Sequence, residues 1–279
     1  MRTKLLVGLI ALVCVGCGGG GSSSPAPITI LISSDFEASG NTEIYKIVGS
    51  AVPVRLTNSA GEDGTVDVVG NSVVFFSTRN GRAEIFKMNL DGSNLQRLTN
   101  NTATDRDDMY PRLSPDGTRI LFRRTDLSGG NLFVMDADGT NVTQLTTNGG
   151  FSGCWSPDGS RVAFSGDELS VINADGSGLI AITSNMDTTH DPTWTTAGIV
   201  FGGSQAGIQG LWRIDAIGNP PVRLTTTISI DEQPEFTPDR TAVVFARLGD
   251  ILTVPLAAPN TVTTFVDLGG NETGAAFSQ

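Results

Sequence analysis

The feature that most constrains the fold is a short motif, an apolar residue followed by threonine, that recurs along the chain. The copies read RLT at 55–57, RLT at 97–99, QLT at 144–146, AIT at 181–183 and RLT at 223–225, with TFV at 264–266 as a degraded sixth copy. Their central residues are separated by 42, 47, 37, 42 and 41 positions. A period of about 40 residues in a sequence of short strands and tight turns predicts a β-propeller, with one four-stranded sheet per repeat.

Residues 111–146 show how one repeat divides. The segments PRLS, RILFRR, LFVMD and NVTQLT predict four strands, and the turns PDGT and ADGT separate the first pair and the last pair. Proline fixes φ in such turns, and Asp-Gly between two alternating runs is a strong hairpin signal. The apolar strand after SPDG is expected to be buried between neighbouring sheets.

The two ends of the chain predict how the ring closes. ITILIS, EIYKIV and PVRLT supply the second, third and fourth strands of an N-terminal blade that lacks a first strand. The C-terminal segment TGAAFSQ matches a first strand, with Phe277 and Ser278 at the places of Trp155 and Ser156. The sequence therefore predicts an all-β, six-bladed β-propeller in which the C-terminal strand completes the N-terminal blade, a 3+1 closure that removes exposed sheet edges.

The segments PRLSPDGTRILF, GCWSPDGSRVAF, DPTWTTAGIVF and QPEFTPDRTAVVF, each followed by the hairpin and the threonine motif, resemble the TolB-like six-bladed propellers, whose PD40 repeat is related to the WD repeat. The resemblance covers residues 28–279. TolB itself is a soluble periplasmic protein with an additional N-terminal α/β domain, and a different segment stands in that place here. The resemblance implies a fold more than an activity, because propellers host many unrelated functions.

Residues 1–16 resemble a bacterial lipoprotein signal peptide, with Arg2 and Lys4 before an apolar run of 11 residues that is too short to span a bilayer. The resemblance implies that Cys17 is lipidated and becomes the mature N-terminus, although Cys14 stands where leucine is usual; ordinary secretion is the alternative. Residues 17–27 then form a flexible Gly/Ser/Pro tether, and residues 28–279 the propeller. In Gram-negative lipoproteins a residue other than aspartate after the lipidated cysteine, here Gly18, implies the outer membrane.

The net charge limits the classes of binding partner, and the cysteine content limits the disulfides that can form. The chain has 29 acidic and 18 basic residues, a net charge of −11, so we expect no binding to nucleic acid. Of the three cysteines, Cys14 leaves with the signal peptide and Cys17 carries lipid, so Cys154 has no disulfide partner and is expected to be a buried hydrophobe. We expect a monomer.

Acidic residues recur three positions before the first strand of several repeats. In a closed propeller these loops would surround one channel mouth, where carboxylates would favour a cation such as Ca²⁺ or a basic group of a partner. The alternative is that aspartate simply stabilises turns in an acidic protein. The candidate residues at the mouth are Asp63, Asp108, Asp191, Asp231, Glu232 and Glu272.

No catalytic constellation is expected. His190 is the one histidine, too few for the metal sites of lyase propellers, and no GxSxG motif is present. We expect no resident cofactor. The sequence favours a membrane-anchored lipoprotein of the cell envelope whose propeller is a non-catalytic module that binds a protein or peptide. The alternatives are a propeller that binds or degrades envelope glycans, and a component of the Tol–Pal envelope system.

Overall fold

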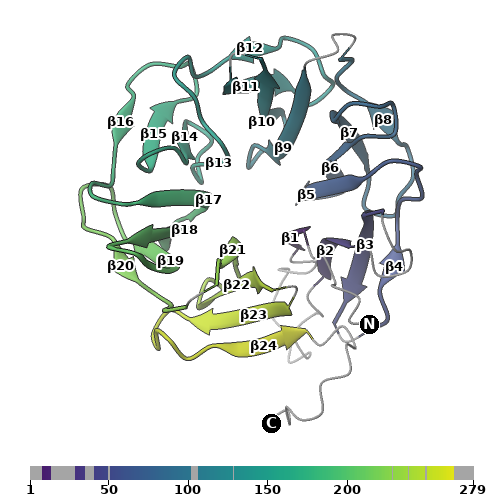
Figure 1. The fold of residues 1–279 in the computed structure, drawn as a ribbon. Coiled ribbons are helices and arrows are strands. Elements are labelled where there is room, and N and C mark those ends of the chain that lie inside the picture. Colours follow the sequence, from purple (N-terminus) through teal and green to yellow (C-terminus); the bar gives the residue numbers. More distant parts are fainter. Residues whose placement is uncertain are drawn as a thin grey trace, which may run out of the picture.

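The architecture is a ring of six sheets. The computed structural model describes residues 8–13, 29–34, 41–49, 51–101, 106–127, 129–227, 229–237, 239–248 and 250–266. These residues form 24 strands in six four-stranded antiparallel sheets, arranged like blades around a central axis (Figure 1). Within them no helix is long and apolar enough to cross a membrane. The prediction of an all-β, six-bladed propeller is confirmed.

Each blade is a meander of four strands, with the first strand nearest the axis and the fourth at the outside (Figure 1). The first three blades contain β1 (Gly8–Val13), β2 (Thr29–Ser34), β3 (Glu43–Val48) and β4 (Val54–Arg55); β5 (Asp63–Val69), β6 (Ser72–Ser77), β7 (Glu84–Asn89) and β8 (Gln96–Arg97); and β9 (Asp107–Leu113), β10 (Arg119–Asp126), β11 (Gly129–Asp136) and β12 (Thr143–Gln144). The last three contain β13 (Gly153–Trp155), β14 (Arg161–Phe164), β15 (Ser170–Asn173) and β16 (Ile180–Ala181); β17 (Thr188–Thr195), β18 (Gly198–Gln205), β19 (Ile208–Ile214) and β20 (Val222–Arg223); and β21 (Glu232–Phe236), β22 (Ala242–Arg247), β23 (Asp250–Pro255) and β24 (Thr263–Val266).

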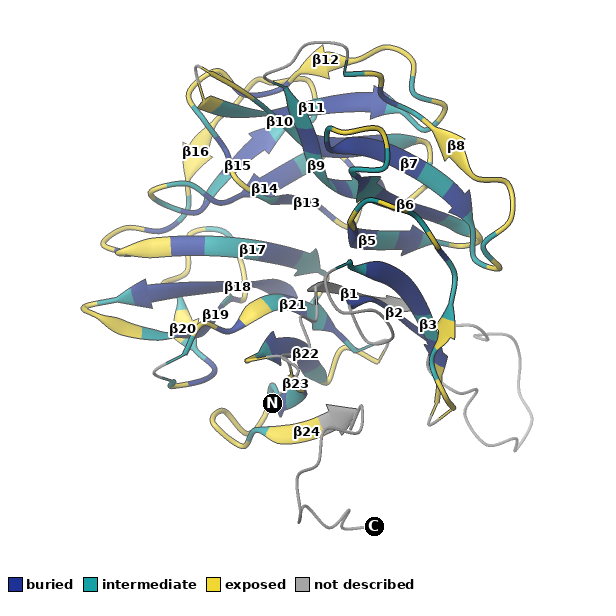
Figure 2. Cartoon of the chain, turned by 45° about the vertical axis from the view of Figure 1, so that its right-hand side comes forward, coloured by how far each residue is buried: buried dark blue, intermediate teal, exposed yellow. Residues whose placement is uncertain are grey.

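The second strand of each repeat is buried on both faces, as the run of apolar residues after SPDG predicts. In β10, Ile120, Leu121 and Phe122 are all fully buried. Leu121 packs into the cluster shared with the following blade, whereas Ile120 and Phe122 pack into the cluster shared with the preceding one. The outermost strands β8, β12, β16 and β20 are short and largely exposed (Figure 2).

The recurring threonine has a structural role that the sequence did not reveal. In the third blade the Thr146 hydroxyl accepts a hydrogen bond of 2.9 Å from the backbone N–H of Leu132. Thr57, Thr99, Thr183 and Thr225 accept the equivalent bond from the third strands of their own blades. Because the fourth strand is only two residues long, this side chain satisfies a buried backbone donor that the strand ladder leaves free.

The two predicted hairpin turns are confirmed. In SPDG the Ser114 hydroxyl donates to Asp116 and accepts from the Arg119 N–H, and Gly117 has a φ of 71°. The hydrogen bond from Ser114, together with those from the Thr118 N–H and hydroxyl, lowers the pKa of Asp116 to about 2. In the outer turn a Cβ on Gly139 would lie 2.8 Å from the Leu98 carbonyl oxygen of the preceding blade, so only glycine fits there.

The closure of the ring differs from the prediction. Residues 273–279 lie outside the described residues. The place beside β2 that the sequence assigns to them is held by β1, from the segment predicted as a signal peptide, in antiparallel register from Gly8↔Ser33 to Val13↔Thr29. This corrects the predicted C-terminal closure. The physical reason is that an inner strand and the apolar run of a signal peptide need the same kind of sequence. The Gly8–Val13 run, GLIALV, is apolar enough for either.

The threonine contact gives a stability prediction. Thr146→Val keeps the shape of the side chain but leaves the buried Leu132 N–H without an acceptor, so we expect the free energy of unfolding to fall by about 1–3 kcal/mol in urea denaturation. Thr143→Val, three residues earlier at the exposed start of β12, is the matched control and should change the free energy of unfolding by less than about 0.5 kcal/mol. Equal effects of the two substitutions would contradict the role of the hydroxyl.

Candidate functional site

A backbone irregularity shapes the inner strands. The pairing of first and second strands shifts register between Gly64 and Asp67, Met109 and Arg112, His190 and Thr193, and Glu232 and Glu235. At each bulge a residue other than glycine has a positive φ: Thr65 (49°), Tyr110 (56°), Asp191 (45°) and Gln233 (53°). A bulge inserts an unpaired residue and re-aims its neighbours. These strained positions lie at the same place in the second, third, fifth and sixth blades, at the end of the channel where the inner strands begin.

Beyond the bulges, corresponding positions of the inner strands place a polar network deeper in the channel. We call Asp67, Arg112, Cys154, Thr193 and Glu235 the channel layer, since one residue comes from each of five consecutive blades. Arg112 Nη1 lies 2.6 Å from Glu235 Oε1 and 3.7 Å from Asp67 Oδ1. Thr193 donates to the second oxygen of Glu235 at 3.0 Å. Blades far apart in sequence are thereby joined across the axis.

The electrostatics of the channel layer follow from its burial. Burial alone would lower the pKa of Arg112, but the carboxylates of Glu235 and Asp67 raise it above its ordinary value. Burial raises the pKa of Glu235, and Arg112 offsets only part of that effect. Burial also raises the pKa of the Cys154 thiol strongly. Cys154 is a free, buried cysteine, as predicted, and its thiol is held in the unreactive form.

The channel layer predicts the reactivity of this thiol. In the folded protein we expect iodoacetamide at mildly alkaline pH to leave Cys154 unmodified, because the thiolate is the nucleophile and is disfavoured here. The peptide that contains Cys154 should become fully labelled in urea, as measured by mass spectrometry. Fast labelling of this peptide without denaturant would show that the thiol is open to solvent and would contradict the described packing.

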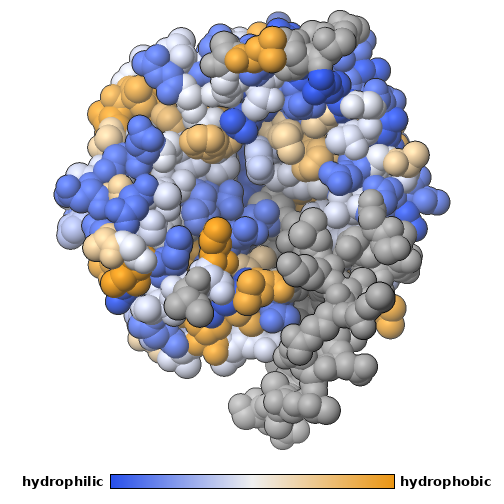
Figure 3. Space-filling model, viewed as in Figure 1, coloured by the Kyte–Doolittle hydropathy of each residue, from blue (hydrophilic) through white to orange (hydrophobic). Residues whose placement is uncertain are grey.

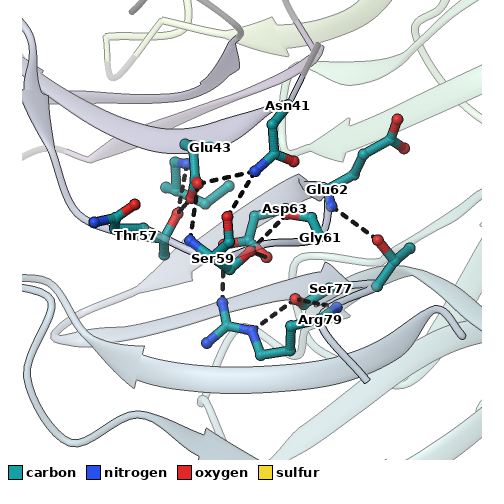
Figure 4. Close-up of polar contacts among 12 residues, drawn as sticks. Asn41, Glu43, Thr57, Ser59, Gly61, Glu62, Asp63, Ser77 and Arg79 are labelled. Atoms are coloured by element: carbon teal, nitrogen blue, oxygen red, sulfur yellow. Dashed lines mark hydrogen bonds and ion pairs between the residues drawn. The ribbon is translucent and has the colours of Figure 1, made fainter. Parts of the chain in front are cut away.

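Three of the predicted mouth carboxylates lie elsewhere. Asp63, Asp108 and Asp231 are fully buried inside their blades. Each is paired with an arginine 16 residues later, on or just after the second strand: Asp63 with Arg79 at 2.8 Å, Asp108 with Arg124 at 2.7 Å and Asp231 with Arg247 at 2.5 Å. Figure 4 shows Asp63 together with Arg79, Ser77 and Ser59, and Ser59 also connects it to the network around Glu43. The expected ring of free carboxylates is therefore corrected, because these three already have a bound cationic group.

The sequence carried a signal for these pairs. Asp63, Asp108 and Asp231 are each followed 16 residues later by arginine, whereas Gly150 and Thr189, at the same place in their repeats, are followed by Gly166 and Gln205. Aspartate and arginine are thus present or absent together. The strands also begin earlier than predicted: β9 starts at Asp107 rather than Pro111, so Asp108 belongs to the sheet and not to a loop.

Buried pairs of this kind predict an asymmetric mutational effect. Arg124→Met leaves Asp108 charged and unpaired in the blade, so we expect a loss of about 3 kcal/mol in the free energy of unfolding. In the double variant with Asp108→Asn the loss should be clearly smaller than the sum of the single ones. Arg82→Met, which removes an exposed pair with Asp107 at 3.3 Å, is the control and should cost at most about 0.5 kcal/mol. Additivity within error in urea denaturation would contradict the pairing.

The side chains that do meet at this end of the channel come from four blades. We call Tyr110, Arg123, Phe151, His190, Asp191 and Glu232 the mouth cluster. His190 Nδ1 lies 3.5 Å from Asp191 Oδ2, and the Asp191 backbone N–H donates to the hydroxyl of Ser152, the neighbour of Phe151. The Arg123 guanidinium stands 5.0 Å from the centre of the Phe151 ring. Seen along the axis, the centre of the ring is hollowed and largely hydrophilic, with hydrophobic groups around it (Figure 3).

The charges of the mouth cluster influence one another. Burial raises the pKa of Tyr110, and so does the charge of Asp191. Burial would also raise the pKa of Asp191, but contacts with His190 and Ser152 hold it below its ordinary value. Loss of water around its carboxyl group, and then the charge of Asp191, raise the pKa of Glu232. Asp191 and Glu232 are therefore the two predicted carboxylates that the structure brings together, and Glu272 lies outside the described residues.

The chemistry that the mouth cluster offers is binding chemistry. Within the described part of the chain no group of three or more histidine, cysteine or acidic side chains is arranged to hold a metal ion. The cluster instead combines one unpaired cation, two carboxylates, a phenol and an exposed ring on a rigid frame. Sequence reasoning identified Asp191, Glu232 and His190 there but missed Arg123, which the strand pattern alone does not distinguish from Arg124.

Fold and site together define this protein as a six-bladed β-propeller with a charged, aromatic mouth on a closed polar channel. The family model described as the TolB beta propeller domain matches residues 19–198. The chain therefore belongs to the TolB β-propeller family. It is 34% identical over 183 residues to the protein TolB homolog of Chlorobium chlorochromatii, which covers 65% of this chain but 32% of that protein. The chain thus spans about a third of the length of this curated relative.

Solved structures share the fold. TolB from Acinetobacter baumannii superposes with a TM-score of 0.62 at 17% identity, covering 86% of this chain and 62% of that one. Oligogalacturonate lyase from Vibrio parahaemolyticus superposes with a TM-score of 0.60 at 12% identity, covering 95% of this chain and 86% of that one. At these identities the likeness concerns architecture, and function has to be argued from the site.

Proposed function

We propose that this chain is a lipid-anchored protein of the bacterial cell envelope whose propeller binds a protein or peptide partner at the mouth cluster. The observation that carries the proposal is the mouth cluster itself. Its charged and aromatic side chains come from four blades of a rigid ring, and its one arginine lacks a carboxylate partner among the described residues. Membership of the TolB propeller family supports an envelope location and a protein partner.

A binding role is proposed in preference to a catalytic one. The channel layer neutralises its own charges, since Arg112 is paired with Glu235 and Asp67, and Cys154 is buried. His190 contacts Asp191. Among the described residues no serine or cysteine side chain forms a hydrogen bond with the His190 ring, as a nucleophile activated by histidine would. The likeness in fold to oligogalacturonate lyase keeps a glycan ligand as the alternative, for which the exposed Phe151 would be the stacking platform.

Site-specific photo-crosslinking in the native envelope tests this function. A photo-reactive amino acid at Phe151, in the mouth cluster, should give a discrete adduct with one envelope protein, and purified unlabelled propeller should compete it away. The matched control is the same amino acid at Asp175, an exposed residue of the hairpin between β15 and β16, which should give no such adduct. A Pal protein as the adduct would place the chain in a Tol–Pal system. Adducts of equal yield at both positions, or none at Phe151 with binding on a glycan array, would overturn the proposal.

The anchor is the second part of the proposed function. Cys17 would carry the acyl chains, and two or more such chains suffice for stable membrane attachment. Cleavage before Cys17 would remove β1, so the processed protein needs another strand beside β2. We expect metabolic labelling with an alkynyl fatty acid to be lost in Cys17→Ala, and the intact mass of the mature protein to start at Cys17. A mature protein that still contains residues 8–13 would overturn the anchor and leave the mouth cluster untouched.

A further inference from the structure

Arg123 differs from the three arginines that pair with the buried aspartates. Arg79, Arg124 and Arg247 also lie over phenylalanine rings, and each of them has a buried aspartate partner. Arg123 is half-buried, and no ion pair among the described residues includes it. Its Nε is buried without a hydrogen-bond acceptor. A cation in this state is unusual in a chain with 29 acidic residues, because a buried donor without an acceptor costs free energy.

The guanidinium of Arg123 is nevertheless held in a fixed place. One face lies 5.0 Å from the centre of the Phe151 ring. Beneath it lies Gly130, where a Cβ would come within 2.5 Å of both Nε and Nη2. Gly130 does not have the left-handed φ that demands glycine, so the missing side chain provides room for the arginine. A guanidinium presents its donors in a planar fork that matches a carboxylate.

The geometry points to Arg123 as the group that receives a carboxylate of the bound peptide, with Tyr110 beside it and Phe151 contacting an apolar neighbour of that carboxylate. This inference rests on the proposed function and names the chemistry that the mouth cluster selects. The ligand is a peptide with an acidic residue next to an apolar one.

The surroundings of Arg123 argue against polyanionic ligands. Tyr110 lies within electrostatic reach of Arg123, Asp191 and Glu232 together, so the mouth cluster carries negative charge close to its one free cation. A phosphate chain would meet repulsion from both carboxylates. A single carboxylate within an otherwise neutral or basic peptide can pair with Arg123, and the rest of that peptide is not repelled by Asp191 and Glu232. The Phe151 ring is 56% exposed and so presents apolar area to a neighbouring side chain.

Two matched peptide libraries test the inference. Both contain randomised short peptides, with a central glutamate in one and a central glutamine in the other. The propeller is incubated with an equal mixture, and the retained peptides are quantified by mass spectrometry. We expect the wild-type chain to enrich the glutamate peptides about tenfold or more, the factor that corresponds to a charge-assisted hydrogen bond. In Arg123→Met this enrichment should fall to about one while glutamine peptides are still retained.

The control variant is Arg161→Met. Arg161 lies at the start of β14, next to the inner hairpin at the other end of the blade, and stacks on Trp194 at 5.1 Å. It should keep the wild-type enrichment, and circular dichroism confirms that both variants are folded. Retention of both libraries without a glutamate preference, or an unchanged preference in Arg123→Met, would overturn the role of Arg123 alone. Retention of neither library would overturn the proposed function and this inference with it.

Discussion

Apolar packing between neighbouring blades is the interaction on which the rest of the structure depends. Consecutive residues of a second strand face opposite neighbours: Val73 and Phe75 pack toward the first blade, and Val74 packs toward the third. A strand with both faces buried must be apolar at every position, which explains the unbroken runs in the sequence. Because every blade is packed on two sides, the inner strands are fixed around the axis, and the positions of their side chains in the channel follow.

That arrangement imposes a constraint on polar residues near the axis. Five inner strands bring one residue each to the channel layer, so a charge there is balanced by residues distant in sequence. Arg112 is balanced by Glu235, 123 residues later, and by Asp67. The bulge preceding this layer re-aims the neighbouring side chains at the cost of a positive φ at Tyr110, Asp191 and Gln233. Packing between neighbouring blades holds these strained backbone positions in place, whereas an isolated sheet would relax them by straightening.

Much of the fold could be predicted because its signals are local and repeated. Turn residues and the spacing of the threonine motif predict blade number, strand order and both hairpins. Predictions failed where a distant partner decides the outcome. Asp63, Asp108 and Asp231 look like loop residues until their arginines, on or just after the next strand, are placed beside them. The strand beside β2 was assigned from a pattern at the C-terminus, whereas β1 satisfies the same requirements for length and apolar character. Sequence pattern alone does not rank two segments that compete for one place.

The repeat also explains where the candidate site lies. The buried aspartate–arginine pair is present in the second, third and sixth blades and is replaced by Gly150 with Gly166, and by Thr189 with Gln205, in the fourth and fifth. Phe151 and His190 directly follow the two replaced positions, and Asp191 comes next. In the blades that keep the pair, the buried aspartate at the start of the inner strand stabilises its own blade by pairing with the arginine. Where it is lost, the following residues Phe151, His190 and Asp191 belong to the mouth cluster. The third and sixth blades keep the pair and also contribute Tyr110, Arg123 and Glu232 to that cluster. Departures from an internally consistent pattern are expected at functional positions, and here they adjoin three residues of the mouth cluster, Phe151, His190 and Asp191.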